Sequence, residues 1–148
     1  MIVPLTLACL LQASNYYHLD PNILESVRIA EAGHVGKATR NSDGSYDLGP
    51  FQINTSWVGR FRKMHHPIDP VKIRDNGCVN AYYAAYILRR EIAEAHGNVL
   101  IGVGHYHSRD PFESRRYRKR VFRILENLLR HHFLKRAKEA QNIQVASQ

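Results

Sequence analysis

The chain of 148 residues contains no long apolar run, only two cysteines and two methionines, and a single tryptophan. Because a membrane-spanning helix needs about 20 consecutive apolar residues, no segment is expected to cross a bilayer. Hydrophobic residues make up 44% and charged residues 23% of the chain, which is typical of a folded globular domain and excludes extensive disorder. The length favours a single domain with a sizeable core.

Motifs for metal binding are also missing, although the chain has nine histidines. The sequence contains neither a His-Glu-x-x-His run nor a Cys-x-x-Cys pair. The obvious pairs are His65-His66, His105 with His107, and His131-His132, but adjacent histidines in a basic helix are usually solvated, so we do not interpret these pairs as metal ligands. We therefore expect no metal site and no cofactor.

Basic residues are concentrated in the last part of the chain. Residues 1–108 carry 10 basic and 9 acidic side chains, a net charge of +1, whereas residues 109–148 carry 11 and 4, a net charge of +7. A cationic surface of this kind attracts nucleic acid, anionic lipid or acidic wall polymers, and composition does not choose among them. A solvated, arginine-rich helix face explains the same pattern without a partner.

The first clear element is a helix that begins at Pro21, with Asp20 as its N-cap and Gly33 as its stop. It places Glu31 in the last turn, where the helix dipole disfavours a carboxylate and raises its pKa. A turn-rich loop or small hairpin should follow over residues 36–47. A short helix is expected after Pro50.

The remaining sequence is predicted to be mostly helical. We expect a long central helix over residues 78–96, a shorter one over 98–107, and a third from Phe112 onward. This last helix has one apolar stripe, formed by Tyr117, Val121, Ile124, Leu125, Leu128 and Leu129. The fold class is therefore mainly α, with about five to seven helices in one domain over residues 13–140.

Both ends of the chain are assigned separately. Residues 1–12 are apolar but lack the positive start and the length of a complete signal peptide, so we interpret them as a possible signal remnant. Residues 141–148 are expected to form a flexible tail. Cys9 and Cys78 could form one disulfide in an oxidising compartment, or remain two unrelated thiols.

Glu31 and the run from Asp47 to Asn54 carry the chemistry. Cleavage of a glycosidic bond needs an acid that keeps its proton near neutral pH, and Glu31 lies behind apolar residues at a helix end. In the second run, Gly49 permits close backbone approach, Gln52 can bond sugar hydroxyl or N-acetyl groups, and Phe51 can stack. We take Gly49, Phe51, Gln52 and Asn54 as candidate substrate contacts; turn, core and surface roles are the alternatives.

Four motifs in this order resemble the lytic transglycosylase domain. They are Glu31-Ala32-Gly33, the run 47–54, Tyr106-His107-Ser108, and Tyr117 followed by Val121. The resemblance extends from about Cys9 to Val121 and is strongest to the small members that accompany type III and type IV secretion and conjugation machines. The chain departs from that pattern at Ala32, at Pro50-Phe51 and at His107. None of these departures removes the acid.

The resemblance implies a lysozyme-like fold and a periplasmic or cell-envelope location. It implies Glu31 as the sole acid and base, with Gln52, Tyr106 and His107 beside it, and Tyr106 bonded near the carboxyl. It also implies a disulfide between Cys9 and Cys78. The expected substrate is peptidoglycan, cut between N-acetylmuramic acid and N-acetylglucosamine with a 1,6-anhydro product.

Two alternatives remain at this point. Hydrolysis as in a goose-type lysozyme would need a second carboxylate, for which Asp43 and Asp47 are the nearest candidates in sequence. A non-catalytic basic module could instead bind nucleic acid or a secretion-channel partner through the cluster Arg115, Arg116, Arg118, Lys119, Arg120 and Arg123. The second alternative leaves Glu31 and Gln52 unexplained, so nucleic acid is not the expected partner.

Overall fold

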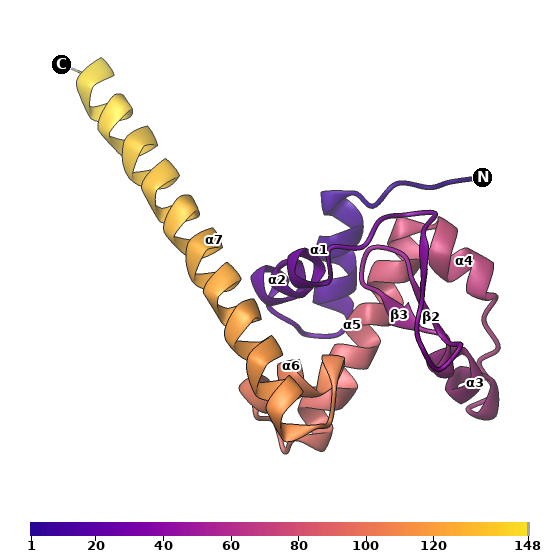
Figure 1. Ribbon diagram of the computed structural model, residues 1–148. Coiled ribbons are helices and arrows are strands. Elements are labelled where there is room, and N and C mark those ends of the chain that lie inside the picture. The colour runs from indigo at the N-terminus through magenta and orange to yellow at the C-terminus, as the bar shows by residue number, and fades with distance from the viewer. Residues whose placement is uncertain (148) are drawn as a thin grey trace.

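The computed structural model describes residues 1–147 and is a lysozyme-like helical domain with one small sheet (Figure 1). The predicted mainly helical class is confirmed. The helices are α1 (Leu7–Tyr16), α2 (Pro21–Glu31), α3 (Ser56–Lys63), α4 (Pro70–Asp75), α5 (Gly77–Glu94), α6 (Val99–His107) and α7 (Pro111–Ala146). The antiparallel sheet has the order β1 (Ala38–Arg40), β2 (Tyr46–Leu48) and β3 (Ile53–Asn54).

Helix α5 runs through the centre of the domain (Figure 1), as the sequence predicted for residues 78–96. It begins where the Asn76 side chain accepts hydrogen bonds from the backbone N–H groups of Cys78 and Val79. Its buried face is rich in small residues, including Ala81, Ala84 and Ala85, so α1, α4 and α6 can pack against it.

One local prediction is wrong, and two helices were not predicted. The helix expected directly after Pro50 begins only at Ser56, because Phe51 and Gln52 form a tight turn and Ile53 pairs with Leu48 in the sheet. Helices α1 and α4 were not predicted as elements. Thr6 and Asp69 start them by accepting hydrogen bonds from backbone N–H groups in the first turn.

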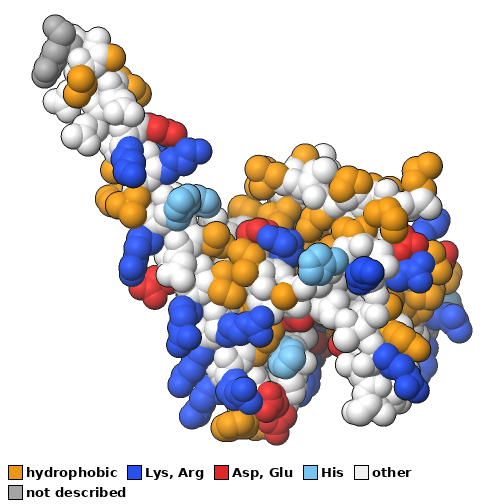
Figure 2. Space-filling model, turned by 45° about the horizontal axis from the view of Figure 1, so that its top comes forward, with side chains coloured by type: hydrophobic (Ala, Val, Ile, Leu, Met, Phe, Trp, Pro, Cys, Tyr) orange, Lys and Arg blue, Asp and Glu red, His pale blue; other side chains and the backbone are white. Residues whose placement is uncertain are grey.

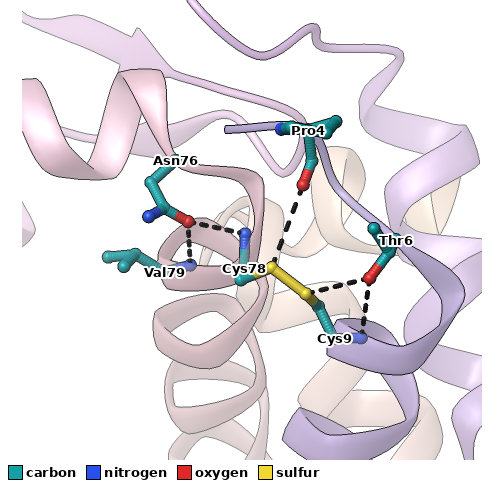
Figure 3. Close-up of a disulfide and its surroundings, with 6 residues drawn as sticks. All are labelled: Pro4, Thr6, Cys9, Asn76, Cys78 and Val79. Atoms are coloured by element: carbon teal, nitrogen blue, oxygen red, sulfur yellow. Dashed lines mark hydrogen bonds between the residues drawn. A yellow bond between two sulfur atoms is a disulfide. The ribbon is translucent and has the colours of Figure 1, made fainter. Parts of the chain in front are cut away.

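Cys9 and Cys78 form a disulfide that joins the start of α1 to the start of α5 (Figure 3). Their Cα atoms are 5.0 Å apart, within the usual range for a disulfide. The Thr6 hydroxyl accepts a hydrogen bond from Cys9 N–H at 3.2 Å and so fixes the beginning of α1. Residues 7–16, within or next to the proposed signal remnant, thus form a helix whose Leu10 and Ala13 are buried in the core.

Asn80 is a buried polar residue that joins three segments of the core. Its Oδ1 accepts a hydrogen bond from Phe51 N–H, and its Nδ2 donates to the carbonyls of Leu48 and Ile73, all at 2.9 Å. Gly49 packs on the same amide, and a Cβ there would lie 2.5 Å from Nδ2. Asn80 therefore fixes the loop 48–52 against α5.

Replacing Asn80 by alanine should cost about 3 kcal/mol of unfolding free energy, because a buried N–H and two buried carbonyls lose their partners. Chemical denaturation of the variant would measure this cost. Asn15→Ala is the matched control, since Asn15 is exposed on α1 and its side chain makes no hydrogen bond within residues 1–147. A loss below about 1 kcal/mol for Asn80→Ala would contradict this assignment.

Helix α7 leaves the globule after its first turns and extends well beyond it (Figure 1). Ser114, Tyr117 and Val121 are buried, and Ile124, Leu125 and Leu128 are partly buried, but Leu129 is 47% exposed. The predicted apolar stripe is therefore packed only at its N-terminal end. Lys and Arg side chains are spaced along the protruding part (Figure 2). Within the described residues, every helix is too short or too polar to serve as a membrane span.

Residues 141–148 were predicted to form a flexible tail. In the structure α7 continues through residues 141–146, which are exposed, and residue 148 lies outside the described residues.

Candidate active site

Glu31 is the last residue of α2, as its position before Gly33 predicted. The helix ends at Ala32, which has a left-handed conformation with φ 54° and whose N–H bonds the Arg28 carbonyl. Gly33 has a different role from the expected helix stop. A Cβ at position 33 would overlap the Gly49 carbonyl and approach Gln52 Nε2. Glycine is thus needed there so that the end of α2 can touch the loop 48–52.

The carboxyl of Glu31 opens into a groove of about 590 Å³. The groove is bounded by the end of α2, the sheet, α3, the C-terminal part of α5, and the corner between α6 and α7. Its lining residues are Glu31, Asn41, Asp43, Ser45, Asp47, Gln52, Ile53, Asn54, Ser56, Trp57, Arg60, Ile87, Glu91, His105, Tyr106, His107, Ser108 and Arg109. Most of them are polar, so the groove suits a hydroxyl-rich ligand rather than a lipid.

Burial raises the pKa of Glu31 to about 7, and the negative charge of Asp47 adds to this effect. Two contacts act in the other direction. The Tyr117 hydroxyl donates a 2.6 Å hydrogen bond to Glu31 Oε1, and the positive charge of Arg120 also favours the carboxylate. The result is a carboxyl group that can both hold and release a proton near neutral pH.

Tyr117 and Arg120 lie one turn apart on α7, and both contact the end of α2. Arg120 Nη2 donates to the Ala30 carbonyl, one of the last carbonyls of α2. The ring of His107 stacks on Tyr117, with centroids 4.6 Å apart and planes 5° apart. Burial lowers the pKa of His107, so this ring favours its neutral form. The Tyr117 phenol is therefore held both by its hydrogen bond to Glu31 and by the stacked ring of His107.

Gln52 lines the groove beside the end of α2, as predicted. Its backbone has a positive φ of 49°, and its Nε2 donates to the Gly49 carbonyl at 2.9 Å. Tyr106 also lines the groove, but its hydroxyl donates to the Phe51 carbonyl at 2.9 Å and not to Glu31. The expectation that Tyr106 helps to orient the Glu31 carboxyl is therefore corrected: Tyr106 supports the loop that carries Gln52.

Two of the predicted substrate contacts cannot touch a ligand in the groove. Phe51 is fully buried in the hydrophobic core, and Gly49 is buried against Asn80. Both residues instead hold the loop 48–52 in place. Gly49 adopts a positive φ of +68°, which glycine accepts without strain, and Phe51 anchors the loop in the core. Asn54 and His107, in contrast, do line the groove.

The sheet side of the groove carries the two candidate second carboxylates. Asp47 Oδ1 accepts a hydrogen bond from Asn54 Nδ2 at 2.9 Å. Asp43 accepts from both the N–H and the hydroxyl of Ser45, which explains its lowered pKa and its turn position. Of the two, Asp47 is the one whose charge acts on Glu31.

Sequence reasoning missed several residues of the site. Tyr117 was recognised only as part of a motif, and its contact with Glu31 spans 86 positions of sequence. Glu91, His105 and Arg109 were not assigned to the site, although Glu91 stands on the inward face of the predicted central helix. A charged residue on an otherwise apolar helix face was the available signal. Among residues 1–147, no group of three or more His, Cys, Asp or Glu side chains is arranged to hold a metal ion.

Replacing Tyr117 by phenylalanine should raise the pKa of Glu31. The lost hydrogen bond stabilises the carboxylate form, so the pKa should rise above about 7, and the alkaline fall in kcat/KM of any reaction that needs Glu31 as an acid should move to higher pH by about one unit. Tyr106→Phe is the matched control, because its hydroxyl bonds a backbone carbonyl instead. An alkaline limb that stays in place, or moves to lower pH, in Tyr117→Phe would refute the assignment.

No protein-family model matches the chain. The chain is similar to the invasion protein IagB of Salmonella typhimurium, in strains SL1344 and LT2, and of Salmonella typhi. In each case 29% of 119 residues are identical, covering 77% of this chain and 72% of the relative.

Proposed function

We propose that the protein is a peptidoglycan lytic transglycosylase that cleaves the bond between N-acetylmuramic acid and N-acetylglucosamine. The observation that carries this proposal is Glu31, a largely buried carboxyl with a pKa raised to about 7, bonded by Tyr117 and open to a polar groove. Such an acid can protonate a poorly basic bridging oxygen at neutral pH.

One carboxyl is sufficient for the proposed reaction. Glu31 donates its proton to the leaving glycosidic oxygen as the bond to the muramyl C1 breaks, and the substrate N-acetyl group stabilises the positive centre. The Glu31 carboxylate then removes the proton from the muramyl 6-hydroxyl, whose oxygen forms the new bond to C1. The product is a 1,6-anhydro ring, Glu31 has regained its proton, and no water is consumed.

Hydrolysis of the same bond is the second candidate, and the position of Asp47 favours it. An inverting or retaining hydrolase needs a second carboxylate beside the acid, and Asp47 lines the groove and acts electrostatically on Glu31. Its hydrogen bond with Asn54 already gives it a local role, so we rank hydrolysis below the transglycosylase reaction.

Mass spectrometry of fragments released from peptidoglycan sacculi would separate the two reactions. Fragments ending in 1,6-anhydromuramyl residues are expected, and they should also appear with Asp47→Asn. Reducing ends that disappear with Asp47→Asn would identify a hydrolase. If no fragment is released by the wild-type protein, the proposed activity is wrong and a non-catalytic adaptor becomes the better description.

We further propose that the enzyme acts in the cell envelope, where it opens the wall locally for a secretion or conjugation apparatus. The similarity to proteins named for invasion supports this setting. The exposed basic residues of α7, among them Arg115, Lys119 and Arg123, are then suited to hold the protein on anionic wall polymers.

The basic cluster also leaves a non-catalytic binding module as a competing description. Binding to sacculi and to DNA should be compared across a salt titration. Tighter binding to sacculi supports attachment to the wall, whereas steep salt-dependent binding to DNA alone would favour the competing module.

A further inference from the structure

A network of charged residues forms part of the groove wall at the corner between α6 and α7. Arg109 Nη2 donates to Glu91 Oε2 at 2.6 Å and to Glu94 Oε2 at 2.5 Å. Arg90 Nε donates to the other oxygen of Glu94 at 2.9 Å. Since the Glu91 side chain is buried, with 4% of its surface exposed, its bond to Arg109 is held in a low-dielectric setting.

This network orients Arg109 but uses only one of its nitrogens. Within residues 1–147, Nε and Nη1 of Arg109 make no hydrogen bond, and the side chain remains 56% exposed while lining the groove. A guanidinium held in this way keeps free N–H groups on Nε and Nη1, and each of them can donate a charge-assisted hydrogen bond to a carboxylate oxygen.

A second arginine lines the same groove from α3. The guanidinium of Arg60 lies over the Trp57 ring, 4.6 Å from its centroid, and forms no salt bridge inside the described part of the chain. The charges of Arg90 and Arg109 balance those of Glu91 and Glu94, so Arg60 leaves the α3 and α5 side of the groove net positive, whereas the acidic Asp43 and Asp47 line the sheet side. Such a wall favours an anionic group on the ligand.

We propose that Arg109, together with Arg60, forms a carboxylate-binding subsite for the peptide stem that muramyl residues carry. The inference rests on the proposed function. The glycan backbone consists of uncharged N-acetylated sugars, whereas the lactyl-linked stem carries free carboxylates. A strand bound in the groove would therefore offer the two arginines a partner only where a stem is present.

In this account Glu91 and Glu94 are positioning residues that fix the guanidinium. The competing explanation is that Glu91 and Arg109 only tie α5 to the corner between α6 and α7. The two explanations differ in ligand preference, because a purely structural tie would affect all ligands of the groove equally.

Binding should be measured by calorimetry in the Glu31→Gln background, so that no turnover occurs. Two muropeptide oligosaccharides serve as ligands, one with free stem carboxylates and one in which they are converted to amides. We expect Glu31→Gln to bind the free-carboxylate form about 10-fold more tightly. Adding Arg109→Lys, which keeps the charge but lacks the free N–H groups of Nε and Nη1, should reduce this preference to within about twofold by weakening binding of the free-carboxylate form more than binding of the amide form.

The double change Glu91→Gln with Arg109→Gln leaves no uncompensated buried carboxylate and should give the same result if the lysine variant folds poorly. Arg116→Gln, on the exposed side of α7 and outside the groove, is the control and should retain the preference. Equal affinity of Glu31→Gln for both ligands, or an equal loss for both with Arg109→Lys, would overturn the subsite alone. Failure to bind either ligand would overturn the proposed function as well.

Discussion

Replacing Glu31 by glutamine should lower the release of soluble fragments from peptidoglycan by about 100- to 10,000-fold. Glutamine keeps the size of the side chain but cannot donate a proton to the leaving oxygen or accept one from the 6-hydroxyl. The effect is expected on kcat more than on binding, because the groove retains its lining. Fragment release from purified sacculi, followed over time, measures it.

Glu25→Gln is the matched control for this variant. Glu25 lies on the same helix and pairs with Arg28 at 2.7 Å, outside the groove. Losing this partly exposed ion pair should cost at most about 1 kcal/mol and leave fragment release near the wild-type rate. If Glu25→Gln loses as much activity as Glu31→Gln, the loss reflects damage to α2 rather than chemistry.

Stability gives an independent check on Glu31→Gln. The folded-state pKa of Glu31, about 7, lies above its ordinary value of 4.5. The stability associated with the protonated carboxyl is therefore fully present below pH 4.5 and is lost as the pH rises through 7. Since glutamine carries no charge, the variant should be more stable than the wild type at pH 8, by about 3 kcal/mol. A variant that is both inactive and less stable at pH 8 would contradict this account.

Removing the disulfide should have the largest effect on stability. Cys9 and Cys78 are 69 positions apart, and opening a loop of this size costs about 4 kcal/mol in the chain-entropy description. The double replacement by alanine should lower the melting temperature by roughly 10 °C. Scanning calorimetry, with denaturant unfolding as a second method, would measure the loss.

Reduction of the wild-type protein provides the control for the alanine substitutions. Treatment with a thiol reductant should destabilise the wild type by a similar amount and leave the double alanine variant unchanged. Thiol counting on the folded wild type should find no free cysteine. Two titratable thiols in the native protein, or no change in melting temperature, would show that the covalent link is absent in solution.

The elements that the sequence predicted well are those with local signals. The start of α2 at Asp20-Pro21, the long α5 and the small glycines of α6 all follow from capping, periodicity or size. Helix α1 was not predicted because an apolar segment near Met1 resembles a signal remnant, and its packing depends on the distant disulfide. The single helix α7 was expected to pack along its apolar stripe, but the globule ends before Leu129.

The site was predictable where a residue type carries its own chemistry. Glu31 and Gln52 face the groove, as their sequence context indicated. The partners could not be read locally, because Tyr117 reaches Glu31 only through the crossing of α7 over α2. For the same reason the roles of Tyr106 and Phe51 were misjudged. Tyr106 supports the loop 48–52 through a hydrogen bond to the Phe51 carbonyl, and the Phe51 side chain anchors that loop in the core.

The proton affinity of Glu31 is the property on which the proposed chemistry depends, and a carbon-13 NMR titration of its side-chain carboxyl measures it directly. Comparison with Glu31→Gln identifies the resonance. A midpoint near pH 7 is expected from the burial of the group, with Tyr117 and Arg120 moderating the effect. A midpoint near 4.5, the ordinary value, would mean that the carboxyl is solvated and ionised at neutral pH and cannot act as the acid.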